Sequence, residues 1–194
     1  IPIGIKDIIA CQEGETTGNS VVYDPDWYAG ADAPVVARLR TAGAVITGKL
    51  TTMEYACGLP DPDKPYPIPR NPWDPTTWPG GSSSGSGAGV AAGLFLGALG
   101  TDTGGSIRIP AAYCGITGMK QTYGLVPKAG CLPLGVTLDH IGPMTRSVAD
   151  AAAMLGIMAG FDPADPSMPP GVAGADYPMM LTGDLSGMRI GVDR

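Results

Sequence analysis

Residues 80–115 constrain the fold of this chain more than any other segment does. Their sequence, GGSSSGSGAGVAAGLFLGALGTDTGGSIRIPAAYCG, has one aspartate and one arginine among 36 residues, and glycine, alanine and serine fill most other positions. Such small side chains favour close approach between neighbouring backbones. The segment predicts a helix from about residue 84–86 to about residue 96, capped by serine, followed by a strand and a tight glycine turn.

The composition of the whole chain is that of a folded α/β protein. Glycine and proline supply 30 and 20 of the 194 residues, but 44% are hydrophobic and only 15% are charged, which is not typical of disorder. The length favours one domain. The patterns predict strands at 1–5 and 44–48, the second short and buried, helices at 33–42 and 147–158, a proline-rich surface loop at 59–79 and an exposed connection at 162–184.

Charge and residue usage exclude several classes of function. The formal net charge is −6, and no basic stripe is present to bind nucleic acid. The single histidine and scattered carboxylates argue against a metal site, and the longest apolar stretch, about 90–99, is too short to span a bilayer. The cysteines show no CxxC or zinc-finger spacing and are interpreted as buried thiols in a reducing, cytoplasmic location: Cys11, Cys57, Cys114 and Cys131.

Two short motifs compete within the glycine-rich segment, and a third, the P-loop, is excluded. Residues 81–85 match the GxSxG nucleophile elbow around Ser83, with Asp102 or Asp139 and then His140 in the order of an α/β-hydrolase triad. That elbow needs a preceding strand, which the prolines before it disfavour. Residues 87–92 match the dinucleotide fingerprint GxGxxA, again without a preceding strand, and no Lys-Ser/Thr ends the glycine run as a P-loop requires.

Several separated blocks of the sequence fit one catalytic family better. Gly80-Gly81-Ser82-Ser83 is followed, 24 positions after Ser82, by Ser106 within the block GTDTGGSIR of residues 100–108. The flanking blocks are IPIGIKD at 1–7, NPW at 71–73, PAAYCG at 110–115, KQTYG at 120–124 and LDHIGP at 138–143. Together they resemble the amidase signature family over nearly the whole chain.

The resemblance implies an α/β fold with a mixed central β-sheet flanked by α-helices, and a Ser-Ser-Lys catalytic triad. Ser106 matches the nucleophile, Ser82 the bridging serine held by a cis peptide bond, and Lys6 the base. Family members are considerably longer, so residues 1–194 are expected to be a single catalytic core that lacks N-terminal helices and a C-terminal portion.

The turn before Ser106 is expected to bind the developing oxyanion. The backbone N–H groups of Thr103, Gly104 and Gly105 can point toward one place, because glycine has no Cβ to block the approach. Asp102 and Arg108 are the only charges in the segment. They are expected to form a buried pair that braces the turn, a structural role rather than a contact with substrate.

The role of base requires burial of Lys6, because a lysine accepts a proton near neutral pH only when its pKa is lowered. The apolar residues expected around it are Ile1, Ile3, Ile5, Ile8 and Ile9. Ser83 is expected to support the site through cap or turn hydrogen bonds. His140 is interpreted as a structural histidine, because a lysine-based triad leaves it no role.

The implied activity is hydrolysis of a carboxamide C–N bond through a serine acyl-enzyme, without a cofactor. Two alternatives use the same triad: the glutamine-hydrolysing subunit of a tRNA-dependent amidotransferase, and a carbamate- or urea-type hydrolase. Outside the enzyme class, a noncatalytic fragment or a glycine-rich nucleotide-binding module stays open. The expected partners are a small-molecule amide, the remaining parts of the same polypeptide and a possible homo-oligomer.

Overall fold

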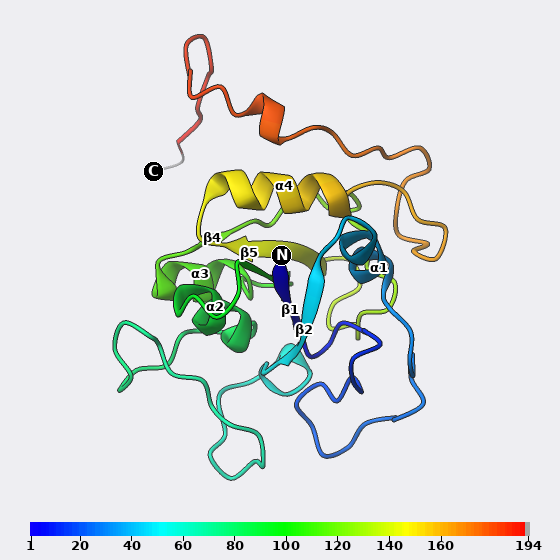
Figure 1. The fold of residues 1–194 in the computed structure, drawn as a ribbon, viewed down its shortest axis with the longest axis vertical. Coiled ribbons are helices and arrows are strands. Elements are labelled where there is room, and N and C mark those ends of the chain that lie inside the picture. Colours follow the sequence, from blue (N-terminus) through cyan, green and yellow to red (C-terminus); the bar gives the residue numbers. More distant parts are fainter. Residues whose placement is uncertain (193–194) are drawn as a thin grey trace.

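A five-stranded mixed sheet with helices on both faces forms the body of the protein, as a computed structural model of residues 1–192 shows (Figure 1). The strands are β1 (Pro2–Lys6), β2 (Val45–Leu50), β3 (Gly97–Asp102), β4 (Thr117–Gly118) and β5 (His140–Thr145). The α-helices are α1 (Pro34–Thr41), α2 (Ser84–Ala91), α3 (Arg108–Cys114) and α4 (Val148–Met158), and the short 3-10 helices are η1 (Glu54–Ala56) and η2 (Pro178–Met180).

The order of the strands places the lysine strand inside the sheet. The order is β2-β1-β3-β5-β4, with β1 parallel to both β2 and β3, and with β5 antiparallel to both β3 and β4. Strand β1 is therefore hydrogen-bonded on both sides. The predicted α/β fold with a mixed sheet is confirmed.

The helices form two layers around this sheet. Helices α1 and α4 pack together on one face, and α2 and α3 pack together on the other (Figure 1). The main apolar core lies under α1 and α4, where the buried side chains of α1 meet Ile3, Ile5, Leu99 and Met154. A smaller cluster of Val90, Phe95 and Ala98 lies under α2. The catalytic candidates lie at the carboxyl ends of β1 and β3, toward the second layer.

Most predicted elements are present, with three differences. Helices α1 and α4 match their predicted ranges, and Ser147 Oγ accepts a hydrogen bond from Asp150 N as the capping box requires. Helix α2 stops at Ala91, five residues early, because the chain turns at Gly93 with a positive φ of 74°. Strand β2 is an edge strand with Val45 62% exposed, not a buried one. Ser83, at the N-cap of α2, makes no side-chain cap hydrogen bond.

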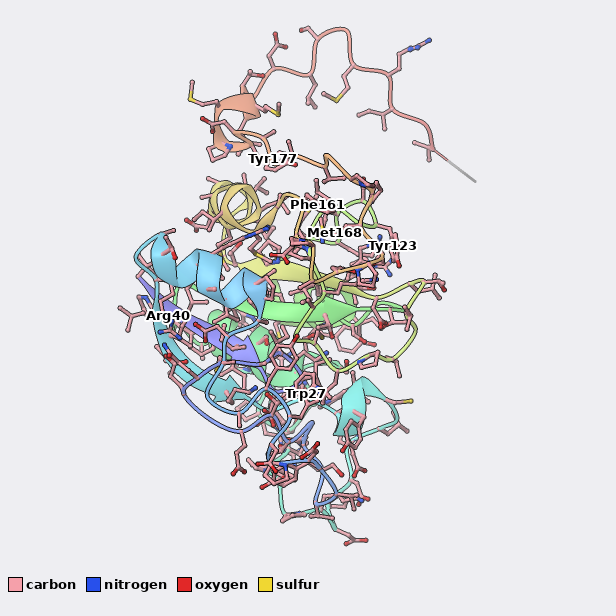
Figure 2. All side chains as sticks on the ribbon, turned by 90° about the vertical axis from the view of Figure 1, so that its right-hand side faces the viewer. Trp27, Arg40, Tyr123, Phe161, Met168 and Tyr177 are labelled. Atoms are coloured by element: carbon pink, nitrogen blue, oxygen red, sulfur yellow. The ribbon has the colours of Figure 1, made fainter. Side chains whose placement is uncertain are left out.

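The predicted exposed connection is only partly exposed. Asp165 and Met168 are buried, which ties the first part of residues 162–184 to the body. Figure 2 shows Tyr177 lying between α4 and the outlying chain, where it packs against the main core. Beyond it, residues 179–192 extend away from the body with exposed apolar side chains.

The small residues of the glycine-rich segment permit the close packing that the sequence predicts. Helix α2 lies against the chain after β2, with Gly85 N donating to Thr51 O at 2.9 Å. A Cβ at Gly85 would lie 2.7 Å from Thr51 O and 2.8 Å from Thr51 N. A Cβ at Gly100 in β3 would lie 3.0 Å from Ser83 Oγ, so both glycines bring α2 onto the sheet.

Replacing Gly85 with alanine should therefore destabilise the protein, although alanine usually stabilises a helix by about 1 kcal/mol relative to glycine. We expect a loss of about 1–3 kcal/mol in the free energy of unfolding, because the obstructing atoms are backbone. Denaturant unfolding measures the change. The matched control is Gly156→Ala in α4, where the added Cβ would lie no closer than 3.3 Å to another atom, Ala175 O in the connection after α4. Equal losses at both positions would contradict the packing argument.

Candidate active site

Lys6 ends β1 with its side chain fully buried. Its Nζ donates hydrogen bonds to Ser82 Oγ at 2.7 Å and to Thr101 Oγ1 at 2.6 Å. None of the ion pairs formed by residues 1–192 includes Lys6. Burial lowers the pKa of Lys6 from 10.5 to about 7, because the charged ammonium loses its hydration. A large fraction of this amine is therefore neutral and able to accept a proton near pH 7.

The surroundings of Lys6 differ in part from those expected. Ile1 is 63% exposed, so it contributes little to the burial, whereas Ile8 and Ile9 are buried. Successive side chains of a strand point to opposite faces, so Ile3 and Ile5 face the layer of α1 and α4, away from the ammonium. Lys6 shares its face with the small residue Gly4 and is covered from the side of α2.

Ser82 and Ser83 precede α2 and lie beside the turn that carries Ser106. The peptide bond between Gly81 and Ser82 is cis, as predicted. Ser82 is buried, and its carbonyl accepts from Thr52 Oγ1 at 2.9 Å. Ser83 N donates to Ser106 O at 3.2 Å, which brings the two serine segments together across the sequence. The Ser106 hydroxyl is half-buried and makes no hydrogen bond with Ser82 or any other residue from 1 to 192.

Asp102 organises the turn before the helix α3. The side chain is fully buried, and its oxygens accept from Gly105 N at 2.9 Å, Ile107 N at 3.1 Å and Arg108 N at 3.3 Å. Arg108 adds two side-chain hydrogen bonds at 2.9 and 3.0 Å. Burial alone would raise the pKa of Asp102, but these donors outweigh it and hold that pKa below its ordinary value. The expected pair is present, although the Arg108 side chain is 54% exposed rather than buried.

The expected oxyanion donors are not equivalent in the structure. The N–H of Gly105 is used within the turn, since it donates to Asp102. The N–H groups of Thr103, Gly104 and Ser106 donate to no residue in the described part of the chain. Two of the three expected donors, Thr103 N–H and Gly104 N–H, are therefore available to bind an oxyanion, and the N–H of Ser106 itself is a third.

The competing motifs lack the geometry that their chemistry needs. Ser83 Oγ is buried, donates to Thr101 O at 3.2 Å and accepts from Thr101 N at 3.1 Å, so it is held away from His140. Irregular chain rather than a strand precedes this serine. His140 Nδ1 lies 2.6 Å from Leu138 O and Nε2 lies 3.4 Å from Lys120 Nζ, a structural setting. The GxGxxA match at 87–92 falls inside α2 rather than at a strand–helix turn.

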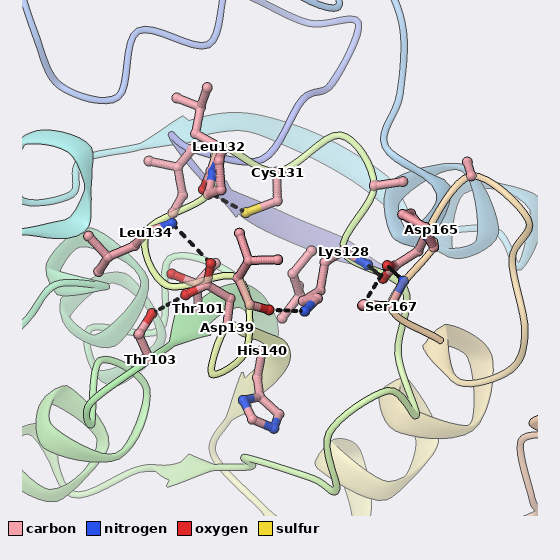
Figure 3. Close-up of a pocket in the computed structure, with 17 residues that line it drawn as sticks. Thr101, Thr103, Lys128, Cys131, Leu132, Leu134, Asp139, His140, Asp165 and Ser167 are labelled. Atoms are coloured by element: carbon pink, nitrogen blue, oxygen red, sulfur yellow. Dashed lines mark hydrogen bonds between the residues drawn. The ribbon is translucent and has the colours of Figure 1, made fainter. Parts of the chain in front are cut away.

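A cavity of about 180 Å³ lies beside Thr101, the residue that contacts both Lys6 and Ser83 (Figure 3). Thr101 and Thr103 form its wall nearest to Lys6 and Ser106, and neither of those two residues lines it. The rest of the lining is mainly apolar and includes Ile8, Leu132, Leu134, Val136 and Ile141. Its polar members are Lys128, Asp139, His140, Asp165 and Ser167. The sequence motifs contained Thr101 and Asp139, but nothing in the pattern singled out Thr101 as a partner of Lys6.

Three other expectations concern the surface and ligands. Cys11 and Cys114 are buried as expected, but Cys131 is half-buried and Cys57 is exposed. Within residues 1–192, no cluster of three or more His, Cys, Asp or Glu side chains is suited to hold a metal ion. No helix in this part of the chain combines the length and apolar character needed to cross a membrane.

Comparison with known proteins places the whole chain in one family. The family model described as Amidase matches residues 1–194. The chain belongs to the amidase family. A curated relative, a glutamyl-tRNA(Gln) amidotransferase subunit of Chloroflexus aurantiacus, is 49% identical over 197 residues, which covers 100% of this chain and 39% of that protein. The chain therefore spans about two fifths of the length of this relative.

Solved structures of other amidase-family proteins share the fold. The corresponding glutamyl-tRNA(Gln) amidotransferase subunit of Thermotoga maritima superposes with a TM-score of 0.82 at 43% identity, over 87% of this chain and 37% of that one. Peptide amidase of Stenotrophomonas maltophilia superposes with a TM-score of 0.82 at 42% identity, over 92% of this chain and 38% of that one. Sequence identities of 43% and 42% to these two structures agree with the family assignment.

Proposed function

We propose that the protein hydrolyses a carboxamide C–N bond through an acyl-enzyme on Ser106. The observation that carries the proposal is the buried, unpaired Lys6, which is hydrogen-bonded to Ser82 at 2.7 Å and has a pKa of about 7. Such an amine can serve as a general base at neutral pH. Residues 1–194 would form a single catalytic core within the longer protein.

Acylation begins with a transfer of two protons. Neutral Lys6 accepts the proton of Ser82 Oγ as Ser82 accepts that of Ser106, and Ser106 Oγ forms a bond to the amide carbonyl carbon. Because the Ser106 hydroxyl makes no hydrogen bond to Ser82 in the structure, the two hydroxyl groups have to approach each other when substrate binds. Hydrogen bonds in active sites often shorten at that stage. The oxyanion then lies against the free N–H groups of Thr103, Gly104 and Ser106.

The intermediate collapses when the C–N bond breaks and Ser82 gives a proton to the leaving nitrogen, which departs as ammonia or an amine. Lys6 returns its proton to Ser82, and a water molecule then attacks the acyl ester through the same relay. The carboxylic acid is released and the Ser106 hydroxyl is restored. Asp102, Arg108 and Ser83 hold the turn and α2 in place, and no cofactor is required.

A second candidate is hydrolysis of glutamine as a subunit of a tRNA-dependent amidotransferase. The 49% identity to the Chloroflexus protein over the full chain favours it as a specific alternative. Release of free ammonia from glutamine by the isolated full-length protein distinguishes the two, since an amidotransferase component would pass ammonia to a partner. A carbamate- or urea-type reaction at the same residues is distinguished by a substrate panel.

The proposal is tested by labelling the full-length protein with a fluorophosphonate, which reports an activated serine without a known substrate. We expect one phosphonyl group, seen by intact mass, as the Ser106 oxygen displaces fluoride. Ser83 and Ser106 lie in the same tryptic peptide, 71–108, so fragment ions must locate the label. A label on Ser83 would transfer the role of nucleophile to the GxSxG motif and overturn the proposed roles.

A further inference from the structure

Asp139 joins the rim of the cavity to the turn that carries the proposed nucleophile. Its Oδ1 accepts from Thr103 Oγ1 at 2.5 Å and from Gly135 N at 2.9 Å. Its Oδ2 accepts from Leu134 N at 2.9 Å and from Gly135 N at 3.0 Å. Figure 3 shows the carboxylate between Thr103 on one side and Leu134 on the other. Residues 36 positions apart are thus fixed to each other by one side chain.

The hydrogen bonds of this carboxylate argue for positioning rather than proton transfer. Both oxygens of this carboxylate are occupied by three donors, the Thr103 hydroxyl and the N–H groups of Leu134 and Gly135, and the last is shared between the two oxygens. Asp139 is also half-buried and lies on the cavity wall. Charge-assisted hydrogen bonds of this kind are shorter and stronger than neutral ones. The rim at 134–135 and the Thr103 side chain therefore form one rigid unit.

Thr103 connects Asp139 to the proposed reaction, because its backbone N–H is one of the proposed oxyanion donors. Thr103 begins the turn that ends at Ser106, carries one of the three free backbone N–H groups and also lines the cavity. A rotation of this residue would displace its N–H from the place where an oxyanion forms. Small displacements of such donors are costly to the rate while leaving the binding of the rest of the substrate intact.

We propose that Asp139 is a positioning residue that holds Thr103, through its hydroxyl, in the orientation that completes the oxyanion site. The inference rests on the proposed function, because it concerns the same serine chemistry. Within residues 1–192 the carboxylate makes no hydrogen bond or ion pair with Ser106, Ser82 or Lys6, and it takes no proton in the proposed reaction. It also fixes Leu134 and Gly135, so the cavity wall and the donors are aligned together.

Fluorophosphonate inactivation of the full-length protein tests this assignment, since its saturation kinetics separate the maximal rate, kinact, from the binding constant, KI. Thr103→Val keeps the shape of the side chain and removes its donor, and it should lower kinact by about 10- to 100-fold with little change in KI. Thr103→Ser retains the hydroxyl and should restore most of the rate. Asp139→Asn should resemble Thr103→Val, and the double variant should be no slower than either single one.

Two results would overturn the inference. One is a Thr103→Val protein with the kinact of the parent, and the other is a double variant whose loss equals the product of the single losses. The unfolding midpoint of each variant separates a local effect from misfolding. If Asp139→Asn does not fold, the comparison of Thr103→Val with Thr103→Ser still tests whether the Thr103 hydroxyl is needed for the full kinact. Failure of the proposed function is distinct, because the parent itself would then carry no label on Ser106.

Discussion

Alanine in place of Ser106 should abolish amide hydrolysis, with a fall in kcat of roughly 10⁴- to 10⁶-fold. The hydroxyl is the only group of the protein that forms a bond to the substrate carbon in the proposed mechanism. The free N–H groups of Thr103 and Gly104 remain, so the residual rate should still exceed that in water. Release of ammonia or amine from a responsive amide measures the change.

The loss should be chemical and not structural. The Ser106 hydroxyl makes no hydrogen bond to any residue between 1 and 192, so its removal leaves no buried partner unpaired. The unfolding midpoint should stay close to that of the parent. Ser186→Ala, at an exposed serine, is the matched control for the substitution itself. Retention of more than a tenth of the parent rate in Ser106→Ala would contradict the assignment of the nucleophile.

Methionine in place of Lys6 should lower kcat by about 10³-fold or more, because it fills the buried space without an amine to accept the proton. In the parent, kcat/KM should rise tenfold per pH unit below about pH 7 and then level off, since only neutral Lys6 is active. The residual rate of Lys6→Met should lack that limb. Rate measurements from pH 5.5 to 9 decide the matter, and an unchanged limb in the variant would assign the titration to another group.

The same pKa makes a prediction for stability with a definite sign. The pKa of Lys6 is near 10.5 in the unfolded chain and about 7 in the folded protein. Between these two pH values the unfolded state therefore binds more protons than the folded state. The free energy of unfolding of the parent should therefore rise relative to Lys6→Met as pH increases from about 7 toward 10.5. Below pH 7 both states are protonated, and the difference between the two proteins should stay constant.

Local sequence patterns predicted those parts of the fold that depend on nearby residues. The capping box at Ser147 and the helix stop at Gly160 are short-range signals, and both ends of α4 follow them. The early end of α2 was missed because apolar residues 93–96 continue the helical composition, while the positive φ at Gly93 reverses the chain toward β3. The exposure of β2 was missed because strand order, which makes it an edge, is a long-range property.

The candidate site shows the same division. Lys6, Ser82 and Ser106 stand in recognisable blocks of the sequence, and the structure joins the first two, since Lys6 Nζ donates to Ser82 Oγ. The catalytic role of each stays a prediction. The capture of the Gly105 N–H by Asp102 depends on the local shape of the turn, which glycine composition does not specify. Thr101 beside Lys6 and Asp139 beside Thr103 depend on contacts across the sheet and loops, for which a single sequence carries no signal.

The double pairing of β1 has a consequence for how activity is lost on heating. Lys6 is attached to a strand that is hydrogen-bonded to β2 and β3 at once, and Thr101 lies on β3 itself. Loosening of the proline-rich loop or of the outlying residues 179–192 leaves this pair undisturbed. Displacing the base requires the cooperative opening of the sheet, so thermal inactivation and global melting should coincide, and amide hydrogens of residues 3–5 should be among the slowest to exchange with solvent.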